Sequence, residues 1–338
     1  MPPLRLRLLL LALVALLAPG GRAAGQAAPE LSGDITHVHD PTVIREGRTF
    51  YLFSTRAGLS VRCSEDLRRW RLCGDVFGHL PGWAVAEVPG LRGLWAPDIS
   101  YFNGRYHLYY SASTFGSNRS AIGLATTPTL DPASEKHWWT DHGKIISSSP
   151  ADNWNAIDPN IVLDEAGRPW LSFGSFWGGI KLRRIDPATG KPSAEDTTLY
   201  SLASRPRGPD LPGAVEAPAI YRRGGYYYLF VSFDFCCRGV KSTYHLRVGR
   251  ARKVTGPYLD REGRPMTEGG GTLLLEGGGR WVGPGHCAIL ETEEGERLVY
   301  HAYDAERRGT PTLRISPLYW DAEGWPTLTP TPPAKGRG

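Results

Sequence analysis

The stretch EAPAIYRRGGYYYLFVSFD, residues 216–234, is one of five copies of a short phrase that returns along the whole chain. The other copies begin with HDPTVI at His39, WAPDIS at Trp95, IDPNIV at Ile157 and GHCAIL at Gly285. The third positions of the copies are 56, 62, 59 and 69 residues apart, namely Pro41, Pro97, Pro159, Pro218 and Cys287. One unit repeated at irregular spacing over a whole chain is typical of a β-propeller, so five copies predict five blades.

Each copy contains the elements of a β-hairpin. A glycine-bearing turn leads into an aromatic and aliphatic run that is too short for a helix, as in residues 50–53, 106–110 and 226–231. A single hairpin cannot bury its faces in water, so the copies must pack on one another. The chain is also turn-rich, with 41 Gly and 28 Pro in 338 residues. We therefore predict an all-β fold, a single five-bladed propeller over residues 28–328.

In a ring of blades, the first two residues of every copy are expected to lie close to the same central point. If each copy begins the inner strand of a blade, its opening pair lies at the central cavity. The pairs are His39-Asp40, Trp95-Ala96, Ile157-Asp158, Glu216-Ala217 and Gly285-His286. We therefore expect Asp40, Asp158, Glu216 and His286 to meet, although they come from four different blades.

Three carboxylates in one place repel each other unless one holds a proton or a positive group is nearby. Such an arrangement suits the hydrolysis of a glycosidic bond, which needs one carboxylic acid and one carboxylate. Asp-Pro on its own is typical of a turn, and a carbohydrate-binding propeller without catalysis can also place acids in its cavity. The repeat therefore leaves two hypotheses, a glycosidase and a sugar-binding propeller.

Longer phrases resemble one family. The chain is similar to the endo-acting arabinanases of glycoside hydrolase family 43 over roughly residues 33–326. The matching phrases are HDPTVI (39–44), LWAPDI (94–99), STFGSNRSAIGLATT (113–127), NAIDPN (155–160), PWLSFGSFWGGIKL (169–182), EAPAIYRRGGYYYLFVSFDFCCRG (216–239), GPGH (283–286) and YHAYDAERRGTPTLRISPLYWD (300–321).

The resemblance implies a role for each carboxylate. Asp40 matches the general base that activates water, Glu216 the general acid, and Asp158 the carboxylate that raises the pKa of the acid. The family inverts the anomeric configuration, for which the base and the acid stand roughly 6.5–9.5 Å apart. The implied activity is endo-hydrolysis of α-1,5-linked L-arabinan. The alternatives are an exo-acting arabinanase, an α-L-arabinofuranosidase or a β-xylosidase of the same fold. The chain ends soon after the fifth copy, which favours an open cleft.

The resemblance also implies an ion and substrate contacts. His286 matches a position on the propeller axis that is associated with a bound ion, usually calcium, held largely through water. Calcium prefers several oxygen ligands, so a structural histidine is the alternative. The sugar-binding positions, with His37 as a weaker neighbour, are Asp40, Trp95, Phe115, Gly116, Asn155, Ala156, Ile157, Asp158, Ser175, Phe176 and Trp177.

The N-terminus and the charge indicate the compartment and the partners. Residues 1–27 begin with Arg5 and Arg7, continue with an apolar run and end in mostly small residues around Arg22, the pattern of a secretory signal peptide. No stretch reaches 18 apolar residues, so no membrane span is expected. Without this segment the formal charge falls from +5 to about +2, which is not typical of nucleic-acid binding. We expect a secreted monomer that acts on the arabinan side chains of pectin and ends in a flexible tail, residues 329–338.

The five cysteines allow several states. Cys63 and Cys73 flank a short segment that reads as a hairpin, so they are a reasonable local pair. Cys236 and Cys237 are adjacent and could be a vicinal disulfide or two buried thiols. Cys287 takes the place of the proline in the fifth copy and could be a buried thiol.

Overall fold

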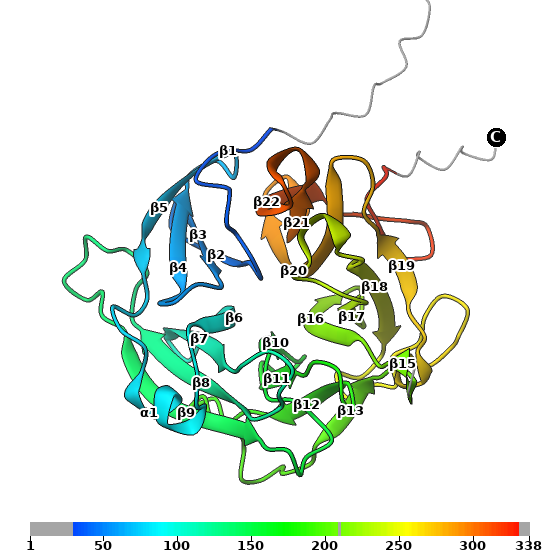
Figure 1. The fold of residues 1–338 in the computed structure, drawn as a ribbon, viewed down its shortest axis with the longest axis horizontal. Coiled ribbons are helices and arrows are strands. Elements are labelled where there is room, and N and C mark those ends of the chain that lie inside the picture. Colours follow the sequence, from blue (N-terminus) through cyan, green and yellow to red (C-terminus); the bar gives the residue numbers. More distant parts are fainter. Residues whose placement is uncertain (1–29, 209–210, 331–338) are drawn as a thin grey trace, which may run out of the picture.

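The protein is a ring of five β-sheets around a central axis (Figure 1). The computed structural model describes residues 30–208 and 211–330. The expected signal peptide, residues 1–27, and most of the expected tail lie outside the described residues. The prediction of an all-β, five-bladed propeller is confirmed.

The blades follow the sequence, each beginning with its inner strand. Blade I has β2 (Thr42–Glu46), β3 (Thr49–Ser54), β4 (Ser60–Ser64) and β5 (Arg69–Asp75), with β1 (Ser32–Gly33) parallel to β5 at the outer edge. Blade II has β6 (Leu94–Phe102), β7 (Arg105–Ala112), β8 (Ser120–Thr127) and β9 (Thr140–Ser148). Blade III has β10 (Asn160–Leu163), β11 (Pro169–Phe173), β12 (Ile180–Arg184) and β13 (Tyr200–Ala203).

The last two blades continue the ring. Blade IV has β16 (Val215–Arg223), β17 (Tyr226–Phe233), β18 (His245–Ala251) and β19 (Thr272–Leu275), and blade V has β20 (Trp281–Thr292), β21 (Gly295–Asp304) and β22 (Thr310–Pro317). Short elements decorate the loops, namely α1 (Gly82–Glu87), η1 (Gly239–Lys241), η2 (Met266–Glu268), η3 (Ala305–Arg307), β14 (Arg207–Gly208), β15 (Leu211–Pro212), β23 (Tyr319–Trp320) and β24 (Pro326–Thr327). In the described part of the chain, no helix has the length and apolar character needed to cross a membrane.

The hydrophobic core is divided among the boundaries between blades. Five clusters of buried side chains are present in the described residues, and each joins two neighbouring blades. Between blades I and II, for example, Phe53 and Leu59 pack with Leu94 and Leu108. Because a blade buries its faces only against its neighbours, closing the ring is what completes the core.

The N-terminal segment closes this ring. Thr36 forms a β-bridge with Thr312 of β22, and the amide of Leu313 donates to the carbonyl of Ile35 at 2.8 Å. The segment then enters β2, so one piece of chain joins the last blade to the first. Blade V, which has three strands of its own, thereby gains backbone partners along the edge that β22 would leave unpaired.

The cysteines occupy three settings. Cys63 and Cys73 form a disulfide between β4 and β5, which confirms the expected local pair. Cys236 and Cys237 form a disulfide between neighbouring residues. Cys287 is a free, buried thiol in the cluster between blades IV and V, and this burial raises its pKa to about 12.

Candidate active site

The five opening pairs share one backbone feature. The second residue of every pair has a left-handed conformation, with φ between 45° and 57°, in the series Asp40, Ala96, Asp158, Ala217 and His286. Residues other than glycine rarely adopt this region, and such positions cluster at functional sites. In blades II, IV and V the pairing register with the second strand also shifts here. These bulges turn the opening residues away from the ladder and toward the axis.

In all five blades, the backbone amide of this second residue is bound by the preceding blade. In four cases the acceptor is a side chain from the end of that blade's second strand. The donor and acceptor atoms are Ala96 N and Thr55 Oγ1 at 2.8 Å, Asp158 N and Ser111 Oγ at 3.0 Å, His286 N and Ser232 Oγ at 2.9 Å, and Asp40 N and His301 Nδ1 at 3.2 Å.

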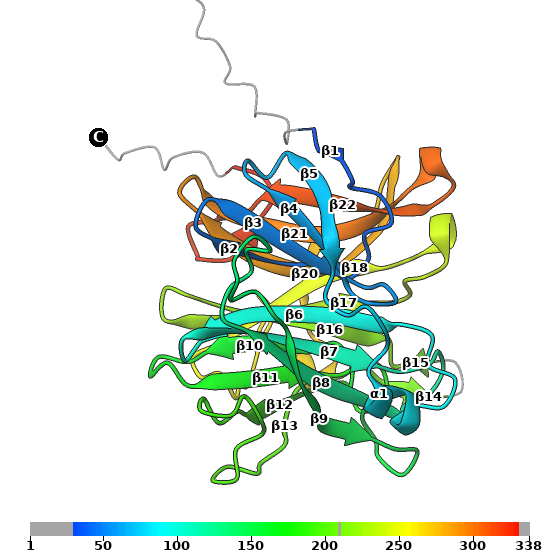
Figure 2. The ribbon, with the colours of Figure 1, turned by 90° about the vertical axis from the view of Figure 1, so that its left-hand side faces the viewer.

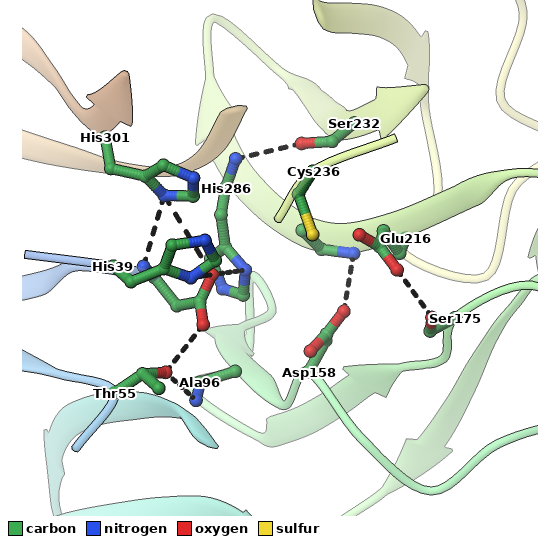
Figure 3. A network of polar contacts seen from close by, with 12 residues as sticks. His39, Thr55, Ala96, Asp158, Ser175, Glu216, Ser232, Cys236, His286 and His301 are labelled. Atoms are coloured by element: carbon green, nitrogen blue, oxygen red, sulfur yellow. Dashed lines mark hydrogen bonds and ion pairs between the residues drawn. The ribbon is translucent and has the colours of Figure 1, made fainter. Parts of the chain in front are cut away.

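Blade III departs from this pattern, and the departure positions a carboxylate. Its residue opposite the opening pair is Gly174, whose amide donates to the carbonyl of Ile157 at 2.8 Å and which offers no side-chain acceptor. The amide of Ala217 instead donates to Oδ2 of Asp158 at 3.0 Å. Asp158 is thereby fixed to the residue that follows Glu216, as Figure 3 shows.

Asp40 is surrounded by hydrogen-bond donors, which belong to His39, Thr55 and His286, labelled in Figure 3. Its Oδ1 lies 2.8 Å from His39 Nδ1 and 3.0 Å from His286 Nδ1, and its Oδ2 accepts from Thr55 Oγ1 at 2.6 Å. Burial alone would raise the pKa of Asp40, but the two imidazoles hold it well below its ordinary value. For His286, burial is outweighed by the neighbouring carboxylates, chiefly that of Asp40, which raise its pKa to about 9. Asp40 is therefore ionised at neutral pH.

Glu216 and Asp158 behave in the opposite way. Burial is the largest cause that raises the pKa of Glu216, against a hydrogen bond from Ser175 Oγ to its Oε2 at 2.6 Å. Burial also raises the pKa of Asp158 to about 8, helped by the charges of Glu216 and Asp40 and opposed by His286. Two neighbouring carboxyls with raised pKa values titrate as a unit, so the pair holds a proton near neutral pH.

These three carboxyls open into one cleft. The cleft has a volume of about 950 Å³. It is lined by all three acids and by eight further residues from the expected sugar-binding set, namely Trp95, Phe115, Gly116, Asn155, Ile157, Ser175, Phe176 and Trp177. Ala156 lies elsewhere, with its methyl group fully buried in the cluster between blades II and III. His37 is exposed outside the cleft, and His286 lies beneath it against Asp40.

Sequence reasoning gave no role to several residues that form this cleft. Thr55 and Tyr303 follow or end second strands, and Cys236, Cys237 and Arg238 come from the loop after β17. For Thr55 a signal was present, because it occupies the same repeat position as Ser111, Ser232 and His301. The loop residues carry no repeat signal, and only the folded chain brings them to the cleft.

Possible metal ligands lie at the same place. Among the described residues, two groups bring three donor atoms within 4.8 Å, namely His39, Cys236 and Cys237, and His39, Asp40 and His301. The sulfurs of the first group are bonded to each other, and the second group is held by hydrogen bonds. His286 belongs to neither group. Its Nδ1 contacts Asp40, so it can offer a metal Nε2 alone, and only in the neutral form of the ring. These residues fit an ion held mainly by water.

Comparison with known proteins agrees with the site. Residues 35–326 match the family model described as glycosyl hydrolases family 43. The chain is 48% identical over 299 residues to the extracellular exo-α-(1→5)-L-arabinofuranosidase ArbA of Cellvibrio japonicus, covering 86% of each chain. It is 47% identical over 295 residues to the extracellular endo-α-(1→5)-L-arabinanase 1 of Bacillus subtilis, covering 86% of this chain and 87% of that one.

A solved structure shows the same architecture. The α-L-arabinanase of Cellvibrio cellulosa in complex with arabinohexaose superposes with a TM-score of 0.84 at 45% identity, covering 88% of this chain and 96% of that chain. The family model covers far more than half of the chain, and the site has the pair of acids that glycoside hydrolysis needs. The chain is a glycoside hydrolase that belongs to glycosyl hydrolases family 43.

Proposed function

We propose that the protein hydrolyses internal α-1,5-L-arabinofuranosidic bonds of arabinan with inversion of configuration and releases arabino-oligosaccharides. The observation that carries the proposal is the separation of acid strengths in one cleft. Asp40 is ionised, whereas the neighbouring carboxyls of Asp158 and Glu216 share one proton. A base and an acid that coexist at one pH are the requirement for this chemistry.

Each group has one task in the reaction. Asp40 accepts a proton from a water molecule whose oxygen attacks the anomeric carbon. Glu216 gives its proton to the departing glycosidic oxygen as that bond breaks. Asp158, fixed by the amide of Ala217, keeps the pKa of Glu216 high until the proton is transferred. Proton exchange with solvent then restores both groups.

The walls of the cleft suit a furanoside chain. Trp95 and Phe115 stand with ring centroids 5.2 Å apart, and Phe115 is 78% exposed, so its face is free to contact sugar C–H groups. Asn155 is 2% exposed, and its Oδ1 has no hydrogen-bond partner among the described residues. A sugar hydroxyl would satisfy this buried acceptor.

The test is the product profile on linear, debranched arabinan. Endo-hydrolysis releases a spread of oligosaccharides from the outset, and Glu216→Ala should abolish it while oligosaccharide binding is retained. The second candidate is exo action, which the relative named an exo-α-(1→5)-L-arabinofuranosidase favours. Release of one short product from the start would establish exo action instead. Binding without any product would leave a sugar-binding propeller.

We also propose a calcium ion at His286. In support, Asp40 and the Asp158–Glu216 pair, which shares a proton, place net negative charge around this imidazole, and a bound cation would displace the proton of the ring. The ion would add positive charge near the carboxylates. His286→Ala should lower the calcium content of the purified protein, measured by elemental analysis, and full calcium content in the variant would refute the assignment.

Secretion and a monomeric state complete the proposal. Two relatives are named extracellular, and the N-terminal residues have the composition of a signal peptide. Sequencing the N-terminus of protein recovered from the medium tests secretion, and light scattering of the mature protein tests the monomer.

A further inference from the structure

The Cys236–Cys237 disulfide stands in the wall of the cleft, beside the general base proposed above. Both cysteines line the cleft, and Cys237 is exposed. The backbone of Cys237 is left-handed, with φ of 66°. A bond between adjacent side chains closes a small ring that includes their shared peptide, so the disulfide restricts the direction in which the Cys237 amide points.

From that amide, hydrogen bonds lead to Asp40. The Cys237 N–H donates to the hydroxyl oxygen of Tyr303 at 2.7 Å. The same hydroxyl lies 2.7 Å from His39 Nε2, and His39 Nδ1 lies 2.8 Å from Asp40 Oδ1. The chain joins blade IV, blade V and the segment before blade I, so it crosses two boundaries of the ring.

One assignment of donors and acceptors satisfies every contact in this chain of hydrogen bonds. An amide can only donate, so the oxygen of Tyr303 accepts from Cys237 and its own hydrogen remains available for His39 Nε2. His39 then accepts at Nε2 and carries its proton on Nδ1, which faces Asp40. The hydrogen bond at one ring nitrogen thus selects the tautomer that can donate from the other.

The residues packed around His39 hold its ring in this orientation. Its ring stacks on His301 with centroids 3.9 Å apart, and His301 accepts the Asp40 amide. Tyr303 is 2% exposed, so its hydroxyl has no ready substitute in bulk water. All four residues of this chain line the cleft, but Cys237 is the exposed one among them.

We infer that Tyr303 and His39 are positioning residues for Asp40, and that the Cys236–Cys237 disulfide is the outer anchor of this relay. The inference rests on the proposed function. Breaking the disulfide frees the Cys237 peptide to turn, Tyr303 loses a donor that orients it, and His39 can change tautomer. Asp40 then loses a hydrogen bond that orients its carboxylate toward the attacking water. The rate of the chemical step therefore falls more than the affinity for substrate.

The test uses the water-soluble phosphine TCEP as the reductant. The S–S bond breaks, each sulfur takes up one electron and one proton, and the phosphine is oxidised to its oxide with an oxygen atom from water. The protein has a second disulfide, Cys63–Cys73, which lies in blade I and does not line the cleft. The variant Cys63→Ser/Cys73→Ser is therefore the matched control for Cys236→Ser/Cys237→Ser.

With linear arabinan as substrate, we expect TCEP to lower kcat about tenfold in the unmodified protein and in the blade I variant, with KM changed less. In Cys236→Ser/Cys237→Ser, kcat should be low already and insensitive to TCEP. Tyr303→Phe should show a similar fall in kcat. When Tyr303→Phe is combined with Cys236→Ser/Cys237→Ser, kcat should fall little further. When it is combined with the blade I variant, the two losses of kcat should be additive.

Two results would overturn the inference. The first is an unchanged kcat in protein whose Cys236 and Cys237 thiols are shown free by mass spectrometry. The second is a loss of kcat in Tyr303→Phe that is fully additive with the loss of kcat in Cys236→Ser/Cys237→Ser. Both are read against oxidised, unmodified protein, whose own hydrolysis of arabinan tests the proposed function separately.

Discussion

Replacing Ser175 with alanine should make the protein active at higher pH. Ser175 Oγ donates to Oε2 of Glu216 at 2.6 Å, and this hydrogen bond favours the ionised carboxylate, so it lowers the pKa of Glu216. The acid must be protonated to act. Removing the donor therefore raises the pKa, and the alkaline limb of the kcat/KM profile moves upward.

The size of the shift follows from the two states of the carboxyl. A hydrogen bond to a charged group contributes about 1.5–3 kcal/mol and one to a neutral group about 0.5–1.5 kcal/mol, so Ser175 favours the ionised form by about 1.2 kcal/mol. One pKa unit corresponds to about 1.36 kcal/mol, so the limb should move by about one unit. Because Glu216 titrates together with Asp158, the measured value belongs to the pair.

The assay is initial-rate hydrolysis of debranched arabinan from acid to alkaline pH. Ser113→Ala is the control, because Ser113 also lines the cleft but bonds to Ser120 at 2.7 Å rather than to an acid. An alkaline limb that stays in place in Ser175→Ala, or moves downward, would refute the reasoning. A shift of the same size in Ser113→Ala would show that the pH effect does not come from the hydrogen bond between Ser175 and Glu216.

Two further substitutions test the role of Asp158 and the need for glycine at position 174. Asp158→Asn removes the charge that repels ionised Glu216, so the alkaline limb of the pH–rate profile should move downward, and an unmoved limb would count against the assigned role. Gly174→Ala places a methyl group against the backbone of the following loop at φ of 131°, which should cost about 1–3 kcal/mol and lower Tm. Gly78→Ala meets nothing within 4 Å and serves as its control, so equal melting temperatures for the two variants would refute the clash.

Much of the fold could be predicted from the repeat alone. The phrase lies at the start of the inner strand in blades I to IV and within it in blade V, and the glycines before the aromatic runs, such as Gly47 and Gly104, are left-handed turn residues in the structure. The convergence of Asp40, Asp158 and Glu216 could be predicted as well, because rotation about one axis brings equivalent positions together. Repetition is visible in a sequence, so what depends on repetition can be read there.

The exception in blade III shows where that reasoning stopped. Gly174 stands where Ser111 and Ser232 supply side-chain acceptors, and its lack of a side chain is what leaves the Ala217 amide to Asp158. The sequence shows the glycine, but its consequence needs the atoms of two blades at once. The same holds for Ala156, which lies between cleft residues in sequence while its own side chain points into the core.

By itself, the sequence determined the number of blades, the three acids and their meeting point. The repeat is visible in the order of the residues, and the symmetry of a ring brings its equivalent positions together. The tertiary structure decided how the acids differ in strength and what holds them. His39 and Tyr303 are 264 residues apart and Tyr303 and Cys237 are 66 apart, yet one hydroxyl joins them. Contacts of this kind depend on the closure of the ring and on single loops that no repeat encodes, so only the folded chain brings their atoms within hydrogen-bonding distance.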